Sequence, residues 1–339
     1  MRLCVVGAGA IGGVLAARLA LAGEEVTLLV RGAAQRQAVD REGLTLIETS
    51  GERCLVRGLR TASEASEAGI QDFVILAVKA HHIPALVPGI RALFGAETAV
   101  MTLQNGLPWW YFERLGGPYD GLRLAALDPH GAVAAAIAAR RVIGAVAYMA
   151  AVREGPAVVR RGGGNRIPLG ELDGSESARL RLLAATLARA GFEAPVTEDI
   201  RAELWLKLWG NACFNPIAAL THSTIGGICG HPASRALALA MMEEIAALAA
   251  SLGVAFRQTV AERMAVSERV AQHKPSMAQD VEAGRALEVE ALSGALVELG
   301  RLTATPMPHL AAVHACVKLL DATMAAERCA FVVQKSAAP

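Results

Sequence analysis

The sequence predicts an α/β protein with two domains: one built on a parallel β-sheet, residues 1–197, and an all-α domain, residues 198–335. Three observations support this division. A short apolar run, a glycine-rich turn and a helical pattern follow one another at the N-terminus. Continuous apolar runs, typical of strands buried on both faces, recur through the first domain. From Ile200 onward the apolar residues recur at helical spacing instead.

Size and composition exclude several classes of protein. The chain has 339 residues, 53% of them hydrophobic, and a net charge of +1, so it can bury real cores. The balanced charge disfavours partnership with nucleic acid or an acidic membrane surface. No apolar run approaches the roughly 20 residues of a membrane span, and the N-terminal run meets glycines too early for a signal peptide. The six cysteines lack metal-ligand spacing, so we expect no metal and a reducing, cytoplasmic location.

The N-terminal turn carries the most specific motif. Leu3–Val6 is followed by Gly7-Ala8-Gly9-Ala10-Ile11-Gly12, a helical pattern and a second β-like run, Val26–Val30. This is the context in which G-x-G-x-x-G binds a dinucleotide in a Rossmann fold. Gly7 makes the tight turn, Gly9 lets the backbone approach the pyrophosphate, and Gly12 allows close packing of the helix. The six residues of the turn are therefore predicted to bind the cofactor, with the helix N-terminus facing its phosphates.

The end of the second strand indicates which dinucleotide. An NAD site usually places Asp or Glu there, whereas this strand ends in Val30-Arg31-Gly32. Arg31 suits the 2′-phosphate of NADP(H) through a charge-assisted contact, and Arg36 is close enough in sequence to assist. The alternative is that Arg31 is a solvated loop cation.

Two more polar residues follow predicted strands. Lys79 ends the apolar run Gln71–Val78, and Asn105 follows the run Thr98–Leu103. Ligands of open α/β sheets bind beyond the carboxyl ends of the strands, so we expect Lys79 and Asn105 to contact cofactor or substrate. The alternatives are a surface lysine and an Asn-Gly turn.

A row of polar residues interrupts an apolar helix that begins the second domain. Thr197 or Asp199 can cap it. Lys207, Asn211 and Asn215 lie four residues apart, hence along one side, in a helix otherwise apolar almost all round. Burying these groups is costly unless a function needs them. Pro216 is expected to interrupt the helix directly after the row.

A second predicted helix, Ser276–Leu299, supplies a carboxylate. Glu288 falls in the middle of its apolar stripe, where a charge is expensive unless paired, and Lys207 is the obvious partner. Ser276 opens this helix in a capping-box pattern with Gln279, and a helix start with a hydroxyl also suits a substrate carboxylate. The alternative for Glu288 is a side chain that reaches the edge of the stripe.

Other segments give weaker predictions. Trp109-Trp110-Tyr111-Phe112 either lines a substrate pocket or forms a subunit interface, and with the apolar helical half it is compatible with a homodimer. The residues from Val142 to Leu169 are predicted to be antiparallel strands that complete the sheet. The Gly-rich stretch Thr221–His231 is predicted to be a loop.

These residues suggest carbonyl chemistry. Reduction by a nicotinamide cofactor needs a proton donor at the developing alkoxide, and burial can bring the pKa of a lysine such as Lys207 toward working pH. Asn211 and Asn215 can hold a substrate hydroxyl, and Ser276 a carboxylate.

The chain resembles the ketopantoate reductases (2-dehydropantoate 2-reductases) over nearly its whole length. The resemblance rests on the glycine turn, Arg31, A-V-K-A at Ala77–Ala80, Q-N-G at Gln104–Gly106, I-R-A-E-L-W-x-K-L-x-x-N-x-x-x-N-P at Ile200–Pro216, and S-M-x-Q-D followed by Glu288. It implies a Rossmann domain and an all-α domain like the C-terminal domain of 6-phosphogluconate dehydrogenase. It further implies that Lys207 is the general acid, and that Asn211, Asn215, Ser276 and Glu288 contact substrate or order the lysine. Lys79 and Asn105 would lie where cofactor and substrate meet.

The resulting hypothesis is an enzyme that reduces 2-dehydropantoate to pantoate with NADPH for pantothenate biosynthesis. Two alternatives remain open. One is a 2-hydroxy acid dehydrogenase with the same machinery for another branched or aromatic 2-oxo acid. The other is a protein that senses NADP without turnover, for which a buried proton donor has no use.

Overall fold

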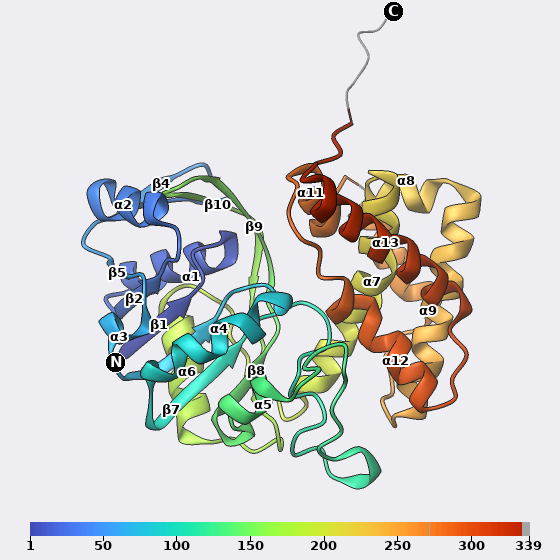
Figure 1. The fold of residues 1–339 in the computed structure, drawn as a ribbon, viewed down its shortest axis with the longest axis horizontal. Helices are drawn as coiled ribbons and strands as arrows, with labels where there is room; N and C mark the ends of the chain where they lie inside the picture. Colours follow the sequence, from blue (N-terminus) through green and yellow to red (C-terminus); the bar gives the residue numbers. More distant parts are fainter. Residues whose placement is uncertain (271, 334–339) are drawn as a thin grey trace, which may run out of the picture. The chain divides into compact units, whose positions relative to one another are not determined.

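The computed structural model describes residues 1–270 and 272–333, which form two compact units (Figure 1). The N-terminal unit comprises Met1–Gln104, Trp109–Arg123 and His130–Glu203. The C-terminal unit comprises Asn105–Pro108, Leu124–Pro129 and the chain from Leu204 onward. The domain limits drawn from sequence, 1–197 and 198–335, stay a prediction, and residue 335 lies outside the described residues.

The N-terminal unit is organised on a seven-stranded sheet of order β11-β8-β7-β6-β1-β2-β5. Its strands are β1 (Arg2–Val6), β2 (Glu25–Leu29), β5 (Arg60–Ala62), β6 (Gln71–Leu76), β7 (Phe94–Thr102), β8 (Val142–Ala145) and β11 (Leu169–Glu171). All neighbouring pairs are parallel except the edge pair β8 and β11. From β5 to β8 this is the Rossmann strand order. Successive strands are added on one side of β1 up to β5 and on its other side from β6 onward, so the order reverses between β1 and β6.

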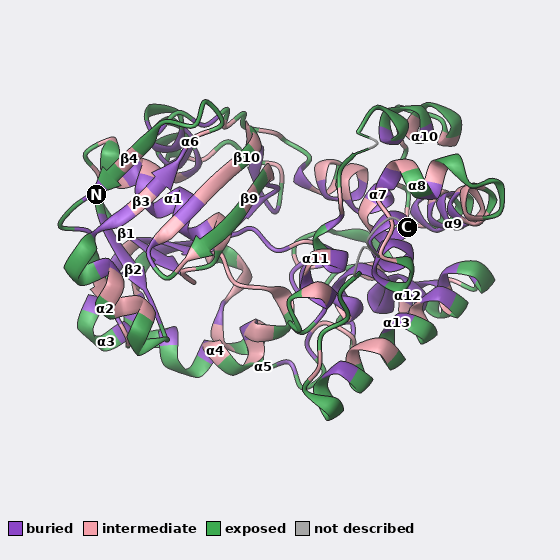
Figure 2. Cartoon of the chain, turned by 90° about the horizontal axis from the view of Figure 1, so that it is seen from above, coloured by how far each residue is buried: buried purple, intermediate pink, exposed green. Residues whose placement is uncertain are grey.

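A second sheet, of order β4-β3-β10-β9, was not expected from sequence. It consists of β3 (Leu44–Ile47), β4 (Arg53–Val56), β9 (Tyr148–Gly155) and β10 (Val158–Arg166). The prediction that all strands after Val142 complete one sheet is therefore wrong, since only β8 and β11 join it. Helix α1 (Ala10–Leu21) packs against strands of both sheets, and Figure 2 shows α1 buried while β9 is largely exposed.

The remaining α-helices that lie wholly within the N-terminal unit are short. They are α2 (Ala33–Glu42), α3 (Ala65–Ala68), α4 (Ile83–Ile90), α5 (Ala132–Ala136) and α6 (Ala178–Arg189). The aromatic segment lies in the interior of this unit: Trp110 is 1% exposed and its indole N–H donates to the Thr102 hydroxyl at 3.0 Å. An added Cβ at Gly144 would lie 2.7 Å from the Trp110 ring. Neither alternative drawn from sequence therefore describes Trp110, which is a core residue.

The described part of the C-terminal unit is helical, as predicted. Its helices are α7 (Ile200–Thr221), α8 (Ile225–Gly230), α9 (Pro232–Ser251), α10 (Val260–Arg269), α11 (Ser276–Glu282), a π-helix (Glu290–Gly294), α12 (Ala295–Leu302) and α13 (Pro308–Glu327). No helix among residues 1–270 and 272–333 has the length and apolarity of a membrane span.

Two predictions made for α7 and the segment after it are wrong. Helix α7 continues through Pro216 to Thr221, although proline has no N–H to donate to the carbonyl of Ala212. Almost every side chain around Pro216 is buried, so packing outweighs the loss of one backbone hydrogen bond. The Gly-rich stretch after α7 contains α8, because the Thr224 hydroxyl caps it and Ile228 anchors it in the core.

The helix predicted over Ser276–Leu299 is interrupted. Helix α11 ends at Glu282, and Gly284 has a φ of +60°, a conformation typical of helix ends. Glu288 thus lies in a non-helical segment, not on a continuous stripe. The predicted capping box is also absent from α11: its N-cap is Pro275, and the Gln279 amide donates to the carbonyl of Lys274 at 2.9 Å.

Candidate functional site

The glycine turn lies at the point where the strand order reverses. Gly7 has a φ of +110°, and a Cβ there would lie 2.7 Å from Val78 Cγ1 in the segment that follows β6. A Cβ on Gly12 would lie 1.9 Å from the carbonyl oxygen of Gly7. A Cβ on Gly9 would meet no heavy atom within 4 Å. The fold of the turn therefore requires glycine at residues 7 and 12. At Gly9, by contrast, the space beside the backbone is open.

Helix α1 begins at this turn. Gly9 is its N-cap, no acidic residue occupies the first turn, and the helix starts with Ala10 and Ile11. The first N–H groups of a helix have no partner within the helix, and together with the helix dipole they attract anions. The Ala8 carbonyl is held by the Gln35 amide at 2.7 Å, a contact that sequence reasoning missed because nothing in the local pattern marks Gln35.

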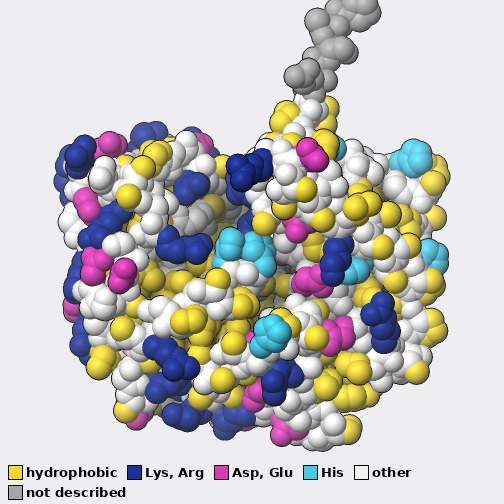
Figure 3. All heavy atoms as spheres, in the orientation of Figure 1, with side chains coloured by type: hydrophobic (Ala, Val, Ile, Leu, Met, Phe, Trp, Pro, Cys, Tyr) yellow, Lys and Arg dark blue, Asp and Glu magenta, His cyan; other side chains and the backbone are white. Residues whose placement is uncertain are grey.

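Two predicted cations of the N-terminal unit act on a common neighbour. Burial lowers the pKa of His82, and the positive charges of Arg31 and Lys79 lower it further. Arg31 is exposed directly after β2, and Lys79 is half-buried after β6. The structure therefore brings these two residues into one positively charged region at the carboxyl ends of the strands. Figure 3 shows Lys and Arg side chains spread over the visible face of this unit.

Arg36 does not join Arg31 and Lys79. Its guanidinium donates to Glu67 at 2.8 Å and to the Ser63 hydroxyl at 2.6 Å, which holds it against α3. The suggestion that Arg36 assists Arg31 is therefore not supported by its contacts.

Gln104 is buried just after the end of β7, and its side-chain amide donates to the carbonyls of Leu76 and Val78 at 2.7 and 3.1 Å. It ties the end of β7 to the segment that carries Lys79.

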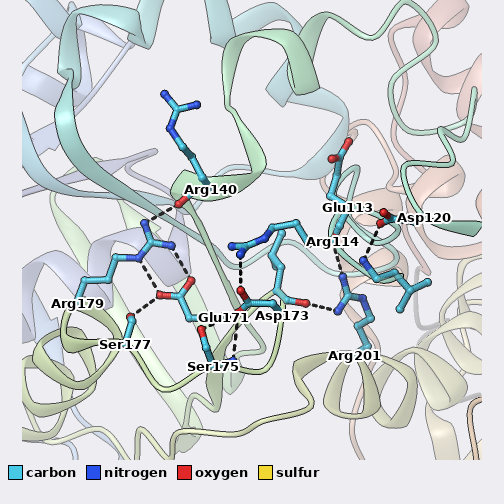
Figure 4. A network of polar contacts seen from close by, with 12 residues as sticks. Glu113, Arg114, Asp120, Arg140, Glu171, Asp173, Ser175, Ser177, Arg179 and Arg201 are labelled. Carbon is cyan, nitrogen blue, oxygen red and sulfur yellow. Dashed lines mark hydrogen bonds and ion pairs between the residues drawn. The ribbon is translucent and has the colours of Figure 1, made fainter. Parts of the chain in front are cut away.

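Helix α7 is anchored in the N-terminal unit by its first turn. Of the two caps considered from the sequence, Thr197 and Asp199, it is Asp199 that accepts from the N–H of Ala202, at 2.9 Å. The Arg201 guanidinium donates to three main-chain carbonyls, those of Tyr111, Leu172 and Glu113, at 2.7, 2.6 and 2.7 Å. Figure 4 shows Arg201 with Glu113, and also the Arg179–Glu171 ion pair.

Glu203 completes the anchor of α7. Its carboxylate accepts from Arg166 at 2.6 and 3.1 Å and from the Tyr148 hydroxyl at 3.0 Å. Glu203 lies four residues before Lys207, so both project from the same side of the helix. The I-R-A-E part of the motif thus fixes the first turn of the helix that carries the polar row.

Lys207 is the basic residue of that row. Although part of the residue remains accessible, the surrounding protein atoms disfavour the ammonium and lower the pKa of Lys207 to about 8, while the negative charge of Glu288 opposes the shift. Glu288 is 8% exposed, and its negative charge acts on the ammonium of Lys207. The structure therefore brings Lys207 and Glu288 together, although the helical stripe that predicted this is interrupted.

The other predicted substrate contacts occupy different settings. Asn211, one turn beyond Lys207 on α7, is half-buried, and Asn215, two turns beyond it, is 5% exposed. Ser276 is exposed at the first position of α11. Asn105 is half-buried in the short segment that belongs to the C-terminal unit, where the next residues dock on the π-helix: the Leu107 N–H donates to the Ala291 carbonyl at 2.9 Å.

A Rossmann-type unit followed by an all-α unit is an architecture of dinucleotide-dependent oxidoreductases. The sequence matches the family described as Ketopantoate reductase PanE/ApbA over residues 3–174, and its C-terminal part over residues 199–321. It is 47% identical to 2-dehydropantoate 2-reductase of Mesorhizobium japonicum over 94% of this chain and 98% of that protein. It is 30% identical to 2-dehydropantoate 2-reductase of Halobacterium salinarum over 89% of this chain and 92% of that protein.

Solved structures of similar fold include a member of the same family. The crystal structure of 2-dehydropantoate 2-reductase from Geobacter metallireducens superposes with a TM-score of 0.82 at 28% identity, covering 94% of this chain and 99% of that one. A D-mandelate dehydrogenase structure also has a TM-score of 0.82, with 96% and 100% coverage, but at 21% identity it shows the fold alone. The chain belongs to the ketopantoate reductase family and is an oxidoreductase acting on a CH–OH group. Reductases of this family depend on a nicotinamide dinucleotide.

Proposed function

We propose that this enzyme reduces 2-dehydropantoate to (R)-pantoate with NADPH, as a step of pantothenate biosynthesis, with Lys207 as the general acid. The observation that carries the proposal is the desolvated ammonium of Lys207, whose pKa is lowered to about 8. The negative charge of the buried Glu288 carboxylate opposes this shift. An acid is most effective when its pKa lies near working pH. Two of the relatives described above are 2-dehydropantoate 2-reductases.

The residues of the N-terminal unit fit a dinucleotide. The outer side of Gly9 is open, the first turn of α1 holds no acid, and the buried Gln104 Oε1 has no hydrogen-bond partner among the described residues. The backbone from Gly7 to Gly12 would hold the pyrophosphate, Arg31 the 2′-phosphate of NADPH, and Lys79 the end nearer the substrate, to which Asn105 of the C-terminal unit would also contribute. When bound, the cofactor supplies a hydride.

The chain's own residues handle the proton and the orientation of the 2-oxo acid. Lys207 gives a proton from Nζ to the oxygen of the reduced C2 carbonyl, and Glu288 keeps that ammonium charged beforehand. Asn211 and Asn215 hold the substrate hydroxyl, and Ser276 its carboxylate. The six cysteines are free, in keeping with a cytoplasmic enzyme. A homodimer and the absence of a nucleic-acid partner stay predictions.

Steady-state oxidation of NADPH with a panel of 2-oxo acids tests the substrate. We expect kcat/KM for 2-dehydropantoate to exceed the values for other branched and for aromatic 2-oxo acids by about 100-fold, the discrimination that well-placed pocket contacts provide. Preference for a bulkier acid would instead make the protein a 2-hydroxy acid dehydrogenase of another specificity. NADPH binding without turnover of any acid would leave a sensing protein, which membership of an enzyme family disfavours.

Substitution of Lys207 tests the general acid. Lys207→Ala is expected to lower kcat by about 10²- to 10⁴-fold and to leave the dissociation constant of NADPH near that of the wild type. Lys207→Arg keeps the charge but not a pKa near neutrality, so it should be almost as slow. Rapid turnover by either variant would assign the proton transfer to another group.

A further inference from the structure

The π-helix Glu290–Gly294 begins two residues after Glu288 and has an unusual hydrogen-bond pattern. The N–H of Ala295 donates to the carbonyl of Glu290, five residues back, whereas in an α-helix it would donate to Ala291. The Ala291 carbonyl instead accepts the N–H of Leu107 at 2.9 Å. One widened turn therefore presents a main-chain acceptor to the segment that carries Asn105.

Gly106 makes this docking sterically possible. It has a φ of +86°, and a Cβ there would lie 2.2 Å from the oxygen and 2.4 Å from the carbonyl carbon of Ala291. Both are backbone atoms of a buried turn, so they cannot move aside as the end of a flexible side chain can. Any side chain at residue 106 must therefore push the Asn105 segment and the π-helix apart.

The main chain beside Glu288 is held firmly on the side that precedes the π-helix. The N–H of Leu287 donates to the Asp321 carboxylate of α13 at 2.9 Å. The carbonyl of Glu288 accepts from the N–H of Leu292 at 3.2 Å. The backbone on both sides of the Glu288 side chain is thus tied to α13 and to the π-helix.

A buried hydroxyl secures the π-helix itself. Ser293 is 1% exposed, and its Oγ donates to the carbonyl of Val289 at 3.0 Å. The same hydroxyl also forms a hydrogen bond with Nδ1 of His314, 2.9 Å away on α13. The wide turn is therefore fixed by side chains, and it links the backbone of Glu288 to the loop of Asn105.

We infer that Gly106 is a positioning residue of the reaction: its close contact with Ala291 docks Asn105 on the same π-helix whose start fixes Glu288. This inference rests on the proposed function of Lys207, Glu288 and Asn105. It explains why a glycine must follow Asn105 and why the turn after Glu288 is wide. Gly106 touches neither reactant; it acts through Asn105 and Glu288.

The test is Gly106→Ala in the full-length enzyme. We expect kcat for the 2-oxo acid to fall by about 10- to 100-fold, the usual effect of a displacement near 1 Å. Because the negative charge of Glu288 raises the pKa of Lys207, its displacement should also move the alkaline limb of the kcat/KM profile to lower pH. A purely structural glycine would lower the melting temperature without moving that limb.

Gly51→Ala is the matched control. Gly51 has a φ of +88°, but a Cβ there meets no heavy atom within 4 Å, so the same backbone strain arises without a clash. We expect Gly51→Ala to keep kcat and the alkaline limb within error of the wild type. An equal loss in both variants would overturn the inference, because strain alone would then explain it.

Ser293→Ala tests the inference if Gly106→Ala does not fold. Losing the bonds to Val289 and His314 should lower kcat severalfold and move the limb in the same direction. The pKa of Lys207 can also be measured without substrate, from the pH dependence of its acylation followed by mass spectrometry. If the folded variants keep the alkaline limb of the kcat/KM profile and the Lys207 pKa of the wild type, the inference is overturned. If the wild type reduces no 2-oxo acid but Gly106→Ala still lowers the Lys207 pKa, the proposed function fails and the positioning role stands.

Discussion

At the scale of single residues, Lys207 and Glu288 illustrate how burial and charge act in opposite directions. Desolvation lowers the pKa of Lys207 to about 8, and Glu288 limits that fall. Without the carboxylate the amine would lose its proton at a lower pH and cease to be an acid. Without burial it would hold its proton too strongly at neutral pH.

Glu288→Gln should therefore change the pH dependence of the reaction. Proton donation needs the ammonium, so activity falls as pH rises through the Lys207 pKa, and removing the negative charge moves this fall to lower pH. The measurement is kcat/KM for the 2-oxo acid against pH. Glu327→Gln, the same change at the exposed end of α13, is the control. An unmoved alkaline limb in Glu288→Gln would contradict the pairing.

Arg31→Ala should weaken NADPH far more than NADH. Arg31 is exposed beside the glycine turn, and a charge-assisted contact to the 2′-phosphate is worth about 1.5–3 kcal/mol, or about 10- to 100-fold in dissociation constant. The two constants can be measured by fluorescence titration. Arg41→Ala removes an exposed arginine at the other end of α2 and should change neither constant. Equal losses for NADPH and NADH would contradict the assignment.

At the scale of elements, helix α7 joins structure and chemistry. Its first turn is fixed by Asp199, Arg201 and Glu203, and the helix then continues through Pro216. The motif I-R-A-E-L-W-x-K therefore contains an anchor followed, one turn later, by the proposed acid. The anchor explains why the motif is so dense in charged groups although only Lys207 is assigned to the reaction.

Arg201→Leu should destabilise the protein more than most substitutions. It leaves three carbonyls without their donor, which we expect to lower the free energy of unfolding by about 3 kcal/mol. Arg201→Lys should recover only part of this, because an ammonium cannot reproduce the guanidinium fork. Chemical denaturation measures the change. Arg140→Leu is the control, because Arg140 is exposed and its side chain makes no drawn contact in Figure 4. Its free energy of unfolding should stay within about 0.5 kcal/mol of the wild type.

At the scale of the whole molecule, the proposed duties are divided between the two units. Gly7–Gly12, Arg31 and Lys79 belong to the N-terminal unit, whereas Asn105, Lys207 and Glu288 belong to the C-terminal unit. The chain enters the C-terminal unit at Asn105–Pro108, well before α7, so the division does not follow a single cut in the sequence. Cofactor binding and proton donation should accordingly respond to different substitutions.

NADPH should stabilise the wild type and Lys207→Ala alike. A ligand at 100 times its dissociation constant adds about 2.7 kcal/mol to the free energy of unfolding, which calorimetry or a dye-based melt detects as a higher Tm. Arg31→Ala should show a smaller rise at the same NADPH concentration. Loss of the rise in Lys207→Ala would mean that the lysine also holds the cofactor.

Sequence alone predicted the parts of this protein that depend on local pattern. The Rossmann-type first half, the glycine turn, a cap at Thr197 or Asp199 and the all-α second half follow from periodicity, glycine spacing and capping, which act over a few residues. Lys207 was found because a polar row in an apolar helix is conspicuous in any sequence. The Lys207–Glu288 pair was also expected, but from a helix that the structure interrupts at Gly284.

Only the tertiary structure decided what depends on distant contacts. The aromatic segment became core because Trp110 fills the space over Gly144, and Pro216 stayed helical because its neighbours are buried on all sides. Arg36 left the cofactor region for Glu67, and Gln35 and Gln104 reached main-chain carbonyls that no local pattern identifies. The π-helix and its fit to Gly106 join residues far apart in the chain, so their energy resides in packing that a single segment does not encode.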